Sequence, residues 1–197
     1  MRWAEQFDAA TYSGASYGEG NIDDGELSPE DIILHEIRWR LAADTKLAAI
    51  FGSAGIEVVD FRTPVDIRDL PRLQLYGGDT GETKFPYQAQ DYAIRVELAA
   101  RWDPGTLGPV APGFGTVWSM WHRVKRVLKA NQMLVTNQAP DIQLAKRSEQ
   151  AGAISAPFVE DIGGDGSRPV CAQILPWNFI VLVDYLTGRL INIQAAG

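Results

Sequence analysis

The segment that most constrains the fold is residues 92–102, in which apolar and polar side chains alternate without a break. The first set is Tyr92, Ile94, Val96, Leu98, Ala100 and Trp102, and the second is Ala93, Arg95, Glu97, Ala99 and Arg101. A period of two is that of a β-strand with one face buried and the other in solvent. Half-buried strands of this kind are typical of antiparallel sheets, so we expect a long strand with one polar face.

Two segments have the spacing of amphipathic helices. The first begins sharply, because Ser28 can cap the helix, Pro29 suits its first position, and Glu30 and Asp31 stand at its positive end. Its apolar face is Ile33, Leu34, Ile37 and Leu41, and a further short turn is expected at residues 45–51, before Gly52. The second helix is expected at residues 116–129, and its buried stripe is Val117, Met120, Trp121, Val124 and Leu128, broadened by Trp118 and Val127.

The remaining apolar segments predict shorter strands. They are residues 56–61, 73–76, 170–175, 179–185 and 190–193, and residues 142–144 hint at one more. Loops are expected at residues 79–90, at residues 103–115, and from residue 145 to residue 168. The sequence therefore predicts the α+β class: a mainly antiparallel β-sheet packed against two amphipathic helices. We expect one domain, residues 28–197, preceded by an extended arm, residues 1–27.

The charge of the chain is concentrated at its start. The net charge is −7, and residues 1–31 hold eight acids and one base, so the rest of the chain is neutral. This balance lacks the basic footprint of nonspecific duplex binding, although DNA could pass through a neutral channel without sequence-specific contact. The arm combines acids with aromatic residues, so we expect it to dock on a neighbour, with a solvated terminus as the alternative. Its candidate contact residues are Trp3, Phe7, Asp23, Asp24 and Glu26.

Nothing in the sequence predicts a membrane protein. The longest run of strong hydrophobes, residues 179–183, is far shorter than the roughly 20 residues that span a bilayer. Residues 1–8 carry charges in place of the apolar core of a secretory signal. Cys171 is the single cysteine, so an intrachain disulfide is excluded, and a reducing cytoplasm is the expected place of assembly.

Residues with catalytic chemistry are sparse. The two histidines, His35 and His122, fall in expected helices, and His122 stands among lysines and arginines that would make it a poor general base. Cys171 has no histidine near it in sequence, and there is no Gly-x-Ser-x-Gly elbow. We therefore expect no catalytic residues and no enzyme.

Metal and cofactor motifs are equally weak. One cysteine and two distant histidines cannot form a structural zinc centre. Residues 21–26 faintly resemble a calcium loop but lack its later glutamate. Residues 77–83 loosely resemble a phosphate loop, but Glu82 stands where the lysine should be, and residues 163–167 indicate a turn. We expect no cofactor and no metal.

One cluster of charges indicates a contact surface. His122, Arg123, Lys125, Arg126 and Lys129 place positive charge on the exposed side of the second helix. A solvated helix face is the plain interpretation. The functional one is contact with the acidic arm of a neighbouring subunit or with passing DNA. Each copy of a closed homo-oligomer would then supply both an acidic arm and a basic face.

Several phrases resemble the tail terminator (tail completion) proteins of long-tailed bacteriophages. In that family a helix and a strand precede a leucine-proline phrase with β-formers and glycine, as in residues 69–78, DLPRLQLYGG. A long alternating strand ending near tryptophan, an amphipathic helix and a last apolar strand follow. Here they match residues 92–102, 116–129 and 177–185. The resemblance covers residues 28–186.

The resemblance implies a homohexameric ring that caps the tail tube and offers a docking face to the head. Its partners would be other copies of itself, the tail tube protein and the head-tail connector or stopper protein, with DNA passing through the lumen. The protein would reside in the virion tail or neck after assembly in the host cytoplasm. The arm and residues 160–168 lengthen this chain relative to compact members, so another neck ring or a minor tail protein stays open. An unrelated oligomeric binding module and an unrecognised enzyme are the remaining alternatives.

Overall fold

The computed structural model describes residues 28–52, 54–59, 69–78, 81–82, 89–103, 117–135, 142–160, 169–184, 190–191 and 193 of the chain. The helices in these parts are α2 (Pro29–Ala43), α3 (Thr45–Phe51) and α4 (Val117–Ala130). The strands are β1 (Ile56–Val58), β2 (Arg72–Gly77), β3 (Gly81–Glu82), β4 (Ala89–Trp102), β5 (Ala145–Gln150), β6 (Phe158–Glu160) and β7 (Val170–Asp184). The predicted α+β class is confirmed.

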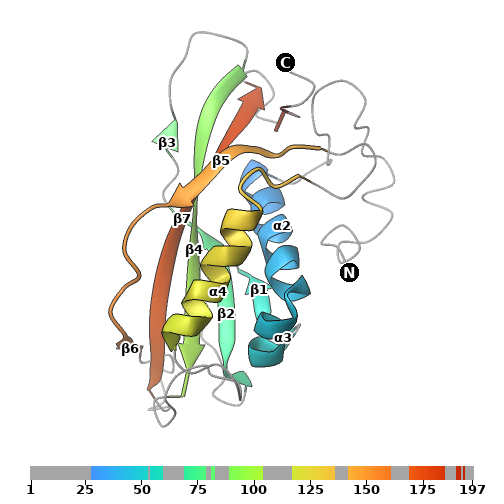
Figure 1. Cartoon of the computed structure of the whole chain (residues 1–197). Coiled ribbons are helices and arrows are strands. Elements are labelled where there is room, and N and C mark those ends of the chain that lie inside the picture. The colour runs from blue at the N-terminus through green and yellow to red at the C-terminus, as the bar shows by residue number, and fades with distance from the viewer. Residues whose placement is uncertain are drawn as a thin grey trace.

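The strands form a single sheet in the order β1-β2-β4-β7-β5, with β3 added beside β4 and β6 beside β7. Only β1 and β2 pair in parallel, and the other pairs between described strands are antiparallel. Strands β4 and β7 pair along their whole length, from Ala89 opposite Asp184 to Trp102 opposite Cys171. The helices lie over one face of this sheet (Figure 1). The prediction of a mainly antiparallel sheet under two amphipathic helices is therefore confirmed.

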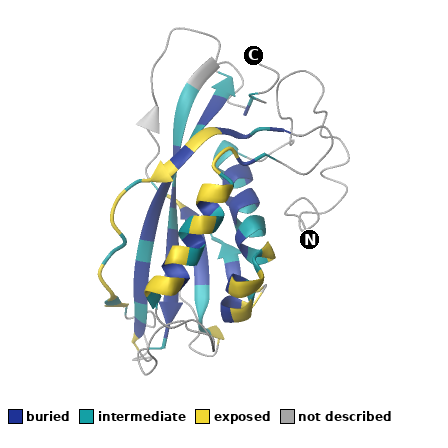
Figure 2. Ribbon diagram, in the orientation of Figure 1, coloured by how far each residue is buried: buried dark blue, intermediate teal, exposed yellow. Residues whose placement is uncertain are grey.

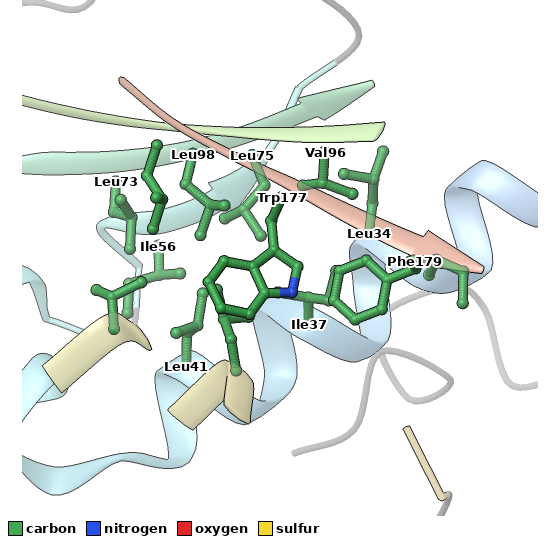
Figure 3. Packing of buried hydrophobic residues seen from close by; sticks show 14 of the residues in the cluster. Leu34, Ile37, Leu41, Ile56, Leu73, Leu75, Val96, Leu98, Trp177 and Phe179 are labelled. Carbon is green, nitrogen blue, oxygen red and sulfur yellow. The ribbon is translucent and has the colours of Figure 1, made fainter. Parts of the chain in front are cut away.

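The core lies between the helices and the sheet. The apolar set predicted on β4 faces the helices, and Ile94, Val96 and Leu98 are fully buried. In Figure 3 the indole ring of Trp177 on β7 lies between side chains of the sheet and those of α2, next to Phe179. Burying side chains of this size supplies most of the free energy that favours folding.

Helix α2 begins as its sequence predicts. The Ser28 hydroxyl accepts a hydrogen bond from the Asp31 amide at 3.1 Å, and the Asp31 carboxylate accepts one from the Ser28 amide at 3.3 Å. This reciprocal cap satisfies two amides that the helix itself leaves unpaired. Two hydrogen bonds between residues far apart in sequence fix α2 against the sheet: Tyr92 donates to Glu30 at 2.8 Å, and Arg38 donates to the Ile56 carbonyl at 2.9 Å.

The strands predicted at residues 170–175 and 179–185 form one strand. Strand β7 runs unbroken through Pro176, where the sequence predicted a break between residues 175 and 179. The carbonyl of Pro176 accepts a hydrogen bond from the Ala151 amide, so the backbone of Pro176 faces away from β4. The missing N–H of proline therefore costs no bond to β4, because N–H and C=O of one residue point to the same side of an antiparallel strand.

The loop predicted from residue 145 to residue 168 is wrong at residues 145–150 and 158–160, which are the strands β5 and β6. Strand β5 pairs with the second half of β7, and β6 pairs with its first residues. Between them, the amides of Ala151 and Ser155 also donate to carbonyls of β7. The sequence of β5, AKRSEQ, has no apolar alternation because it lies at the sheet edge, where few side chains reach the core.

Smaller differences concern strand ends and loops. The loop predicted at residues 79–90 contains β3, and β4 begins within it at Ala89. Within the tail strand predicted at residues 190–193, Leu190 forms a bridge with Val183, and residue 192 lies outside the described parts. Residues 21–26, 60–68, 104–116 and 161–168 lie outside the described parts.

One histidine should make the stability of the fold depend on pH. Burial lowers the pKa of His35 on α2 from its ordinary value of 6.5, Asp31 opposes this shift, and Arg38 adds to it. The folded state therefore resists a proton that the unfolded chain accepts. The free energy of unfolding should fall as the pH drops below 6.5, down to the lowered pKa.

Urea unfolding at several pH values measures this slope. In the variant His35→Gln the slope just below pH 6.5 should be shallower than in the wild type. The matched control is Gln132→Asn, at an exposed position just after α4, which changes no titratable group and should keep the wild-type slope. An unchanged slope in His35→Gln would contradict the assignment.

Candidate functional site

Helix α4 has one face in the core and one in solvent. Met120, Trp121, Val124 and Leu128 are buried, as predicted. The indole nitrogen of Trp121 donates to the side-chain oxygen of Gln173 on β7 at 3.0 Å, which ties the helix to the sheet. Figure 2 shows the opposite side of α4 as a series of exposed turns.

Trp118 does not belong to the buried stripe. The prediction placed it there, but its side chain is 60% exposed. Trp118 lies four residues before the exposed His122, so it belongs to the outer row of the helix. Tryptophan is one of the residues enriched in protein–protein interfaces.

Arg123 forms an ion pair with a carboxylate of its own chain. Its guanidinium binds the carboxylate of Asp44, the residue between α2 and α3, with Arg123 Nε at 2.9 Å and Nη2 at 2.6 Å from Asp44 Oδ2. Burial would raise the pKa of Asp44, but the hydrogen bonds from Arg123 and from the amides of Leu47 and Lys46 outweigh it and hold the pKa below 3.8. Arg123 therefore links α4 to the α2–α3 corner, and its charge is paired within the chain.

The other four predicted residues of this helix have no ionic partner within the described ranges. His122, Arg126 and Lys129 are exposed, and Lys125 is half-buried. We name this set, His122, Lys125, Arg126 and Lys129, the cationic face. Helix α4 contains no acid. The positive charge of this face is consequently not neutralised by its own helix.

A groove runs beside the cationic face, between α2 and α4. Its volume is about 410 Å³. Its walls are Trp39, Arg40, Ala43 and Asp44 on one side, and Arg123, Arg126, Val127, Ala130 and Asn131 on the other. The sequence did not predict it, because a groove between two helices depends on how they pack. The predicted arm residues Trp3, Phe7, Asp23, Asp24 and Glu26 lie outside the described ranges.

The sheet face turned away from the helices was predicted to be polar and solvated. Two of its residues on β4, Ala99 and Arg101, are buried instead. Arg101 is 1% exposed, and its Nε donates to Glu160 Oε2 on β6 at 2.7 Å. On neighbouring strands Gln74 donates to Glu57 at 2.8 Å. Alternation in the sequence identifies the two faces of a strand, but it does not tell which of them another segment covers.

Side chains of the types that bind metal ions are scattered in the described parts of the chain. Within the parts of the chain that are described, no three His, Cys, Asp or Glu side chains cluster to hold a metal ion. Burial and the nearby carboxylate of Asp103 raise the pKa of the Cys171 thiol above 9.0, which disfavours the nucleophilic thiolate. In the glycine-rich residues 77–83, Gly77 belongs to β2, and Gly81 and Glu82 form β3. Residues 79, 80 and 83 lie outside the described parts.

Among the described helices, none combines the length and the apolarity that a membrane span requires.

Comparison with known proteins gives little beyond the geometry. No protein-family model and no curated protein matches the sequence. A chain in the solved structure described as "Virion of native gene transfer agent (GTA) particle" is similar, with 14% sequence identity and a TM-score of 0.44, over 73% of this chain and 90% of that chain. Likeness at this level transfers no function to this protein.

Proposed function

We propose that this chain is a structural subunit of a phage-like virion that forms a homohexameric ring at the head-proximal end of the tail. The ring ends the polymerisation of the tail tube and joins the tail to the head. Its partners are other copies of itself, the tail tube protein and the connector or stopper protein, and DNA passes through its lumen. The subunit has no catalytic role in this proposal.

The positions of the sequence segments that resemble tail terminator proteins support the proposal. The leucine-proline phrase leads into β2, the alternating segment lies in β4, and the amphipathic segment is α4. The last phrase lies mainly in the second half of β7. Each phrase therefore coincides with a packed element of the same α+β arrangement that the resemblance implies.

The observation that carries the proposal is the separation of charge within each subunit. The cationic face of α4 has no ionic partner among the described residues, while the net charge of −7 resides in the first 31 residues. Because the cationic face and the acidic segment lie at different places on one chain, they favour head-to-tail contacts between copies. Such contacts close into a ring when the rotation between subunits allows it. Charge complementarity also selects the correct neighbour during assembly.

Electron microscopy and native mass spectrometry of the purified protein test the ring directly. We expect closed rings of six copies, and rings at one end of the tubes when tail tubes are added. A chain that stays monomeric at every concentration would contradict the proposal. Rings that ignore tail tubes but bind another neck component would favour the alternative of a connector or stopper ring.

Deleting residues 1–27 should weaken self-assembly, because it removes six of the acids that complement the cationic face. The difference from the full chain should be largest at low ionic strength, since salt screens exposed charges beyond about 10 Å at 0.1 M. Sedimentation velocity at low and high salt measures both effects. Equal assembly of the truncated and full chains would show that the arm has no such role.

A further inference from the structure

The groove between α2 and α4 has walls that the chain itself holds in place. The two helices run antiparallel, since Asp44 of the α2–α3 corner meets Arg123 on α4 while Arg40 of α2 bonds to Asn131 just beyond the end of α4. Arg40 also binds Glu36 Oε1 at 2.7 Å and the carbonyl of Val135, and its guanidinium lies 5.5 Å from the Trp39 ring. These contacts fix the position of the Arg40 side chain at the wall of the groove.

The groove combines an aromatic wall with small residues and unpaired positive charge. Trp39 is half-buried and Val127 is half-buried, whereas Ala43 and Ala130 are exposed and leave room beside them. Arg126 belongs to both the groove and the cationic face, and it has no ionic partner within the described ranges. Such a lining fits a peptide that carries both aromatic and acidic side chains.

This chain contains a segment of that chemistry. Residues 1–27 hold six acids and one base, together with the aromatic residues Trp3, Phe7, Tyr12 and Tyr17. The segment ends at the first turn of α2, whereas the groove flanks the last turn of that helix, about 16 Å further along at 1.5 Å per residue. Its own arm would have to run back along α2 to enter the groove, whereas a neighbour's arm can enter from outside.

We infer that the groove between α2 and α4 binds residues 1–27 of the neighbouring subunit, with their aromatic side chains against Trp39 and their acids against Arg126 and the rest of the cationic face. The inference rests on the proposed ring and names the contact that closes it. In the ring each arm reaches the next groove, so every subunit both gives and receives one arm. Docking of the arm would neutralise the cationic face and cover an exposed apolar surface.

Two full-length charge-reversal variants test this contact. The groove variant is Arg126→Glu with Lys129→Glu, and the arm variant is Asp23→Lys with Asp24→Lys and Glu26→Lys. Each alone should assemble roughly 10-fold or more weakly than the wild type in sedimentation velocity, because like charges then face each other at every junction. Arg147→Glu, a reversal at an exposed position on β5, should assemble like the wild type.

A mixture of the two variants distinguishes the neighbour's arm from the chain's own. In an alternating ring of six, the wild-type arm of the groove variant meets a wild-type groove, and the reversed arm of the arm variant meets a reversed groove. An equimolar mixture should therefore assemble within about 3-fold of the wild type, a residual cost of well under 1.4 kcal/mol. If only the double variant on one chain recovers assembly, the arm binds its own groove and the inference is overturned.

A steric variant separates the groove from the general charge of the helix. Ala130→Trp fills the space between the helices without changing charge, and it should weaken assembly by roughly 10-fold at high as well as low salt. Ala49→Trp, at an exposed position of α3 outside the groove, is its control. Normal assembly of both the groove variant and Ala130→Trp would overturn the inference while leaving the ring intact. A wild-type chain that forms no ring would overturn the proposed function, and the inference with it.

Discussion

Replacing Trp121 by alanine should lower the free energy of unfolding by about 3–5 kcal/mol. The side chain is fully buried at the centre of the inner face of α4, and its indole donates the hydrogen bond to Gln173. Alanine would leave a large cavity between α4 and the sheet, and it would also leave the buried oxygen of Gln173 without this donor. Urea or guanidinium unfolding followed by circular dichroism measures the change.

Trp118→Ala is the matched control, since it makes the same replacement three residues earlier on the same helix. Its side chain is 60% exposed, so the free energy of unfolding should change by no more than about 0.5 kcal/mol. Trp121→Phe should lie between the two, because it keeps most of the volume and loses the hydrogen bond. Equal losses at positions 118 and 121 would show that the orientation of α4 described here is wrong.

Replacing Glu160 by alanine should cost about 3 kcal/mol, because it leaves the charge of Arg101 buried without its partner. Arg101 is 1% exposed, whereas the side chain of Glu160 is 15% exposed. Within the described ranges, Arg101 Nη1 already has no hydrogen-bond partner, so little remains to stabilise the guanidinium once the carboxylate is removed. Thermal and denaturant unfolding of the variant measure the loss.

The double variant Arg101→Met with Glu160→Leu separates the lost charge partner from lost packing. Removing both charges replaces an ion pair by apolar side chains, which in buried sites is often neutral or stabilising. The double variant should therefore be more stable than Glu160→Ala. A double variant at least as unstable as the single one would show that the pair contributes mainly through its packing between β4 and β6.

Local signals in the sequence determined much of the fold. The serine, proline and acids at the start of α2 place its first residue, because a helix start depends on the few side chains that can bind its free amides. Gly52 ends α3 with a φ of +70°, a conformation that favours glycine, and the sequence predicted that end. The alternation in β4 predicted the long strand and its buried face, since a period of two leaves few other structures.

Contacts between distant segments decided what the sequence left open or made misleading. Strand β5 is a strand because the edge of β7 offers its backbone partners, although its own side chains carry no strand signal. From the sequence alone Pro176 predicts a break in the strand, but β7 tolerates it because its backbone faces Ala151. Arg101 reads as a solvated residue and is buried beside Glu160 on β6.

The candidate contact surface shows the same division. The sequence by itself determined that α4 carries positive charge, that the chain's negative charge lies at its start, and that α4 has an apolar side, because composition and helical spacing fix these properties. Only the tertiary structure decided that Arg123 pairs with Asp44 and that Trp118 faces solvent. It also decided that a groove lined by Trp39 lies beside Arg126. The reason is physical: charge and periodicity belong to one segment, whereas a groove and an ion pair exist only where two segments meet.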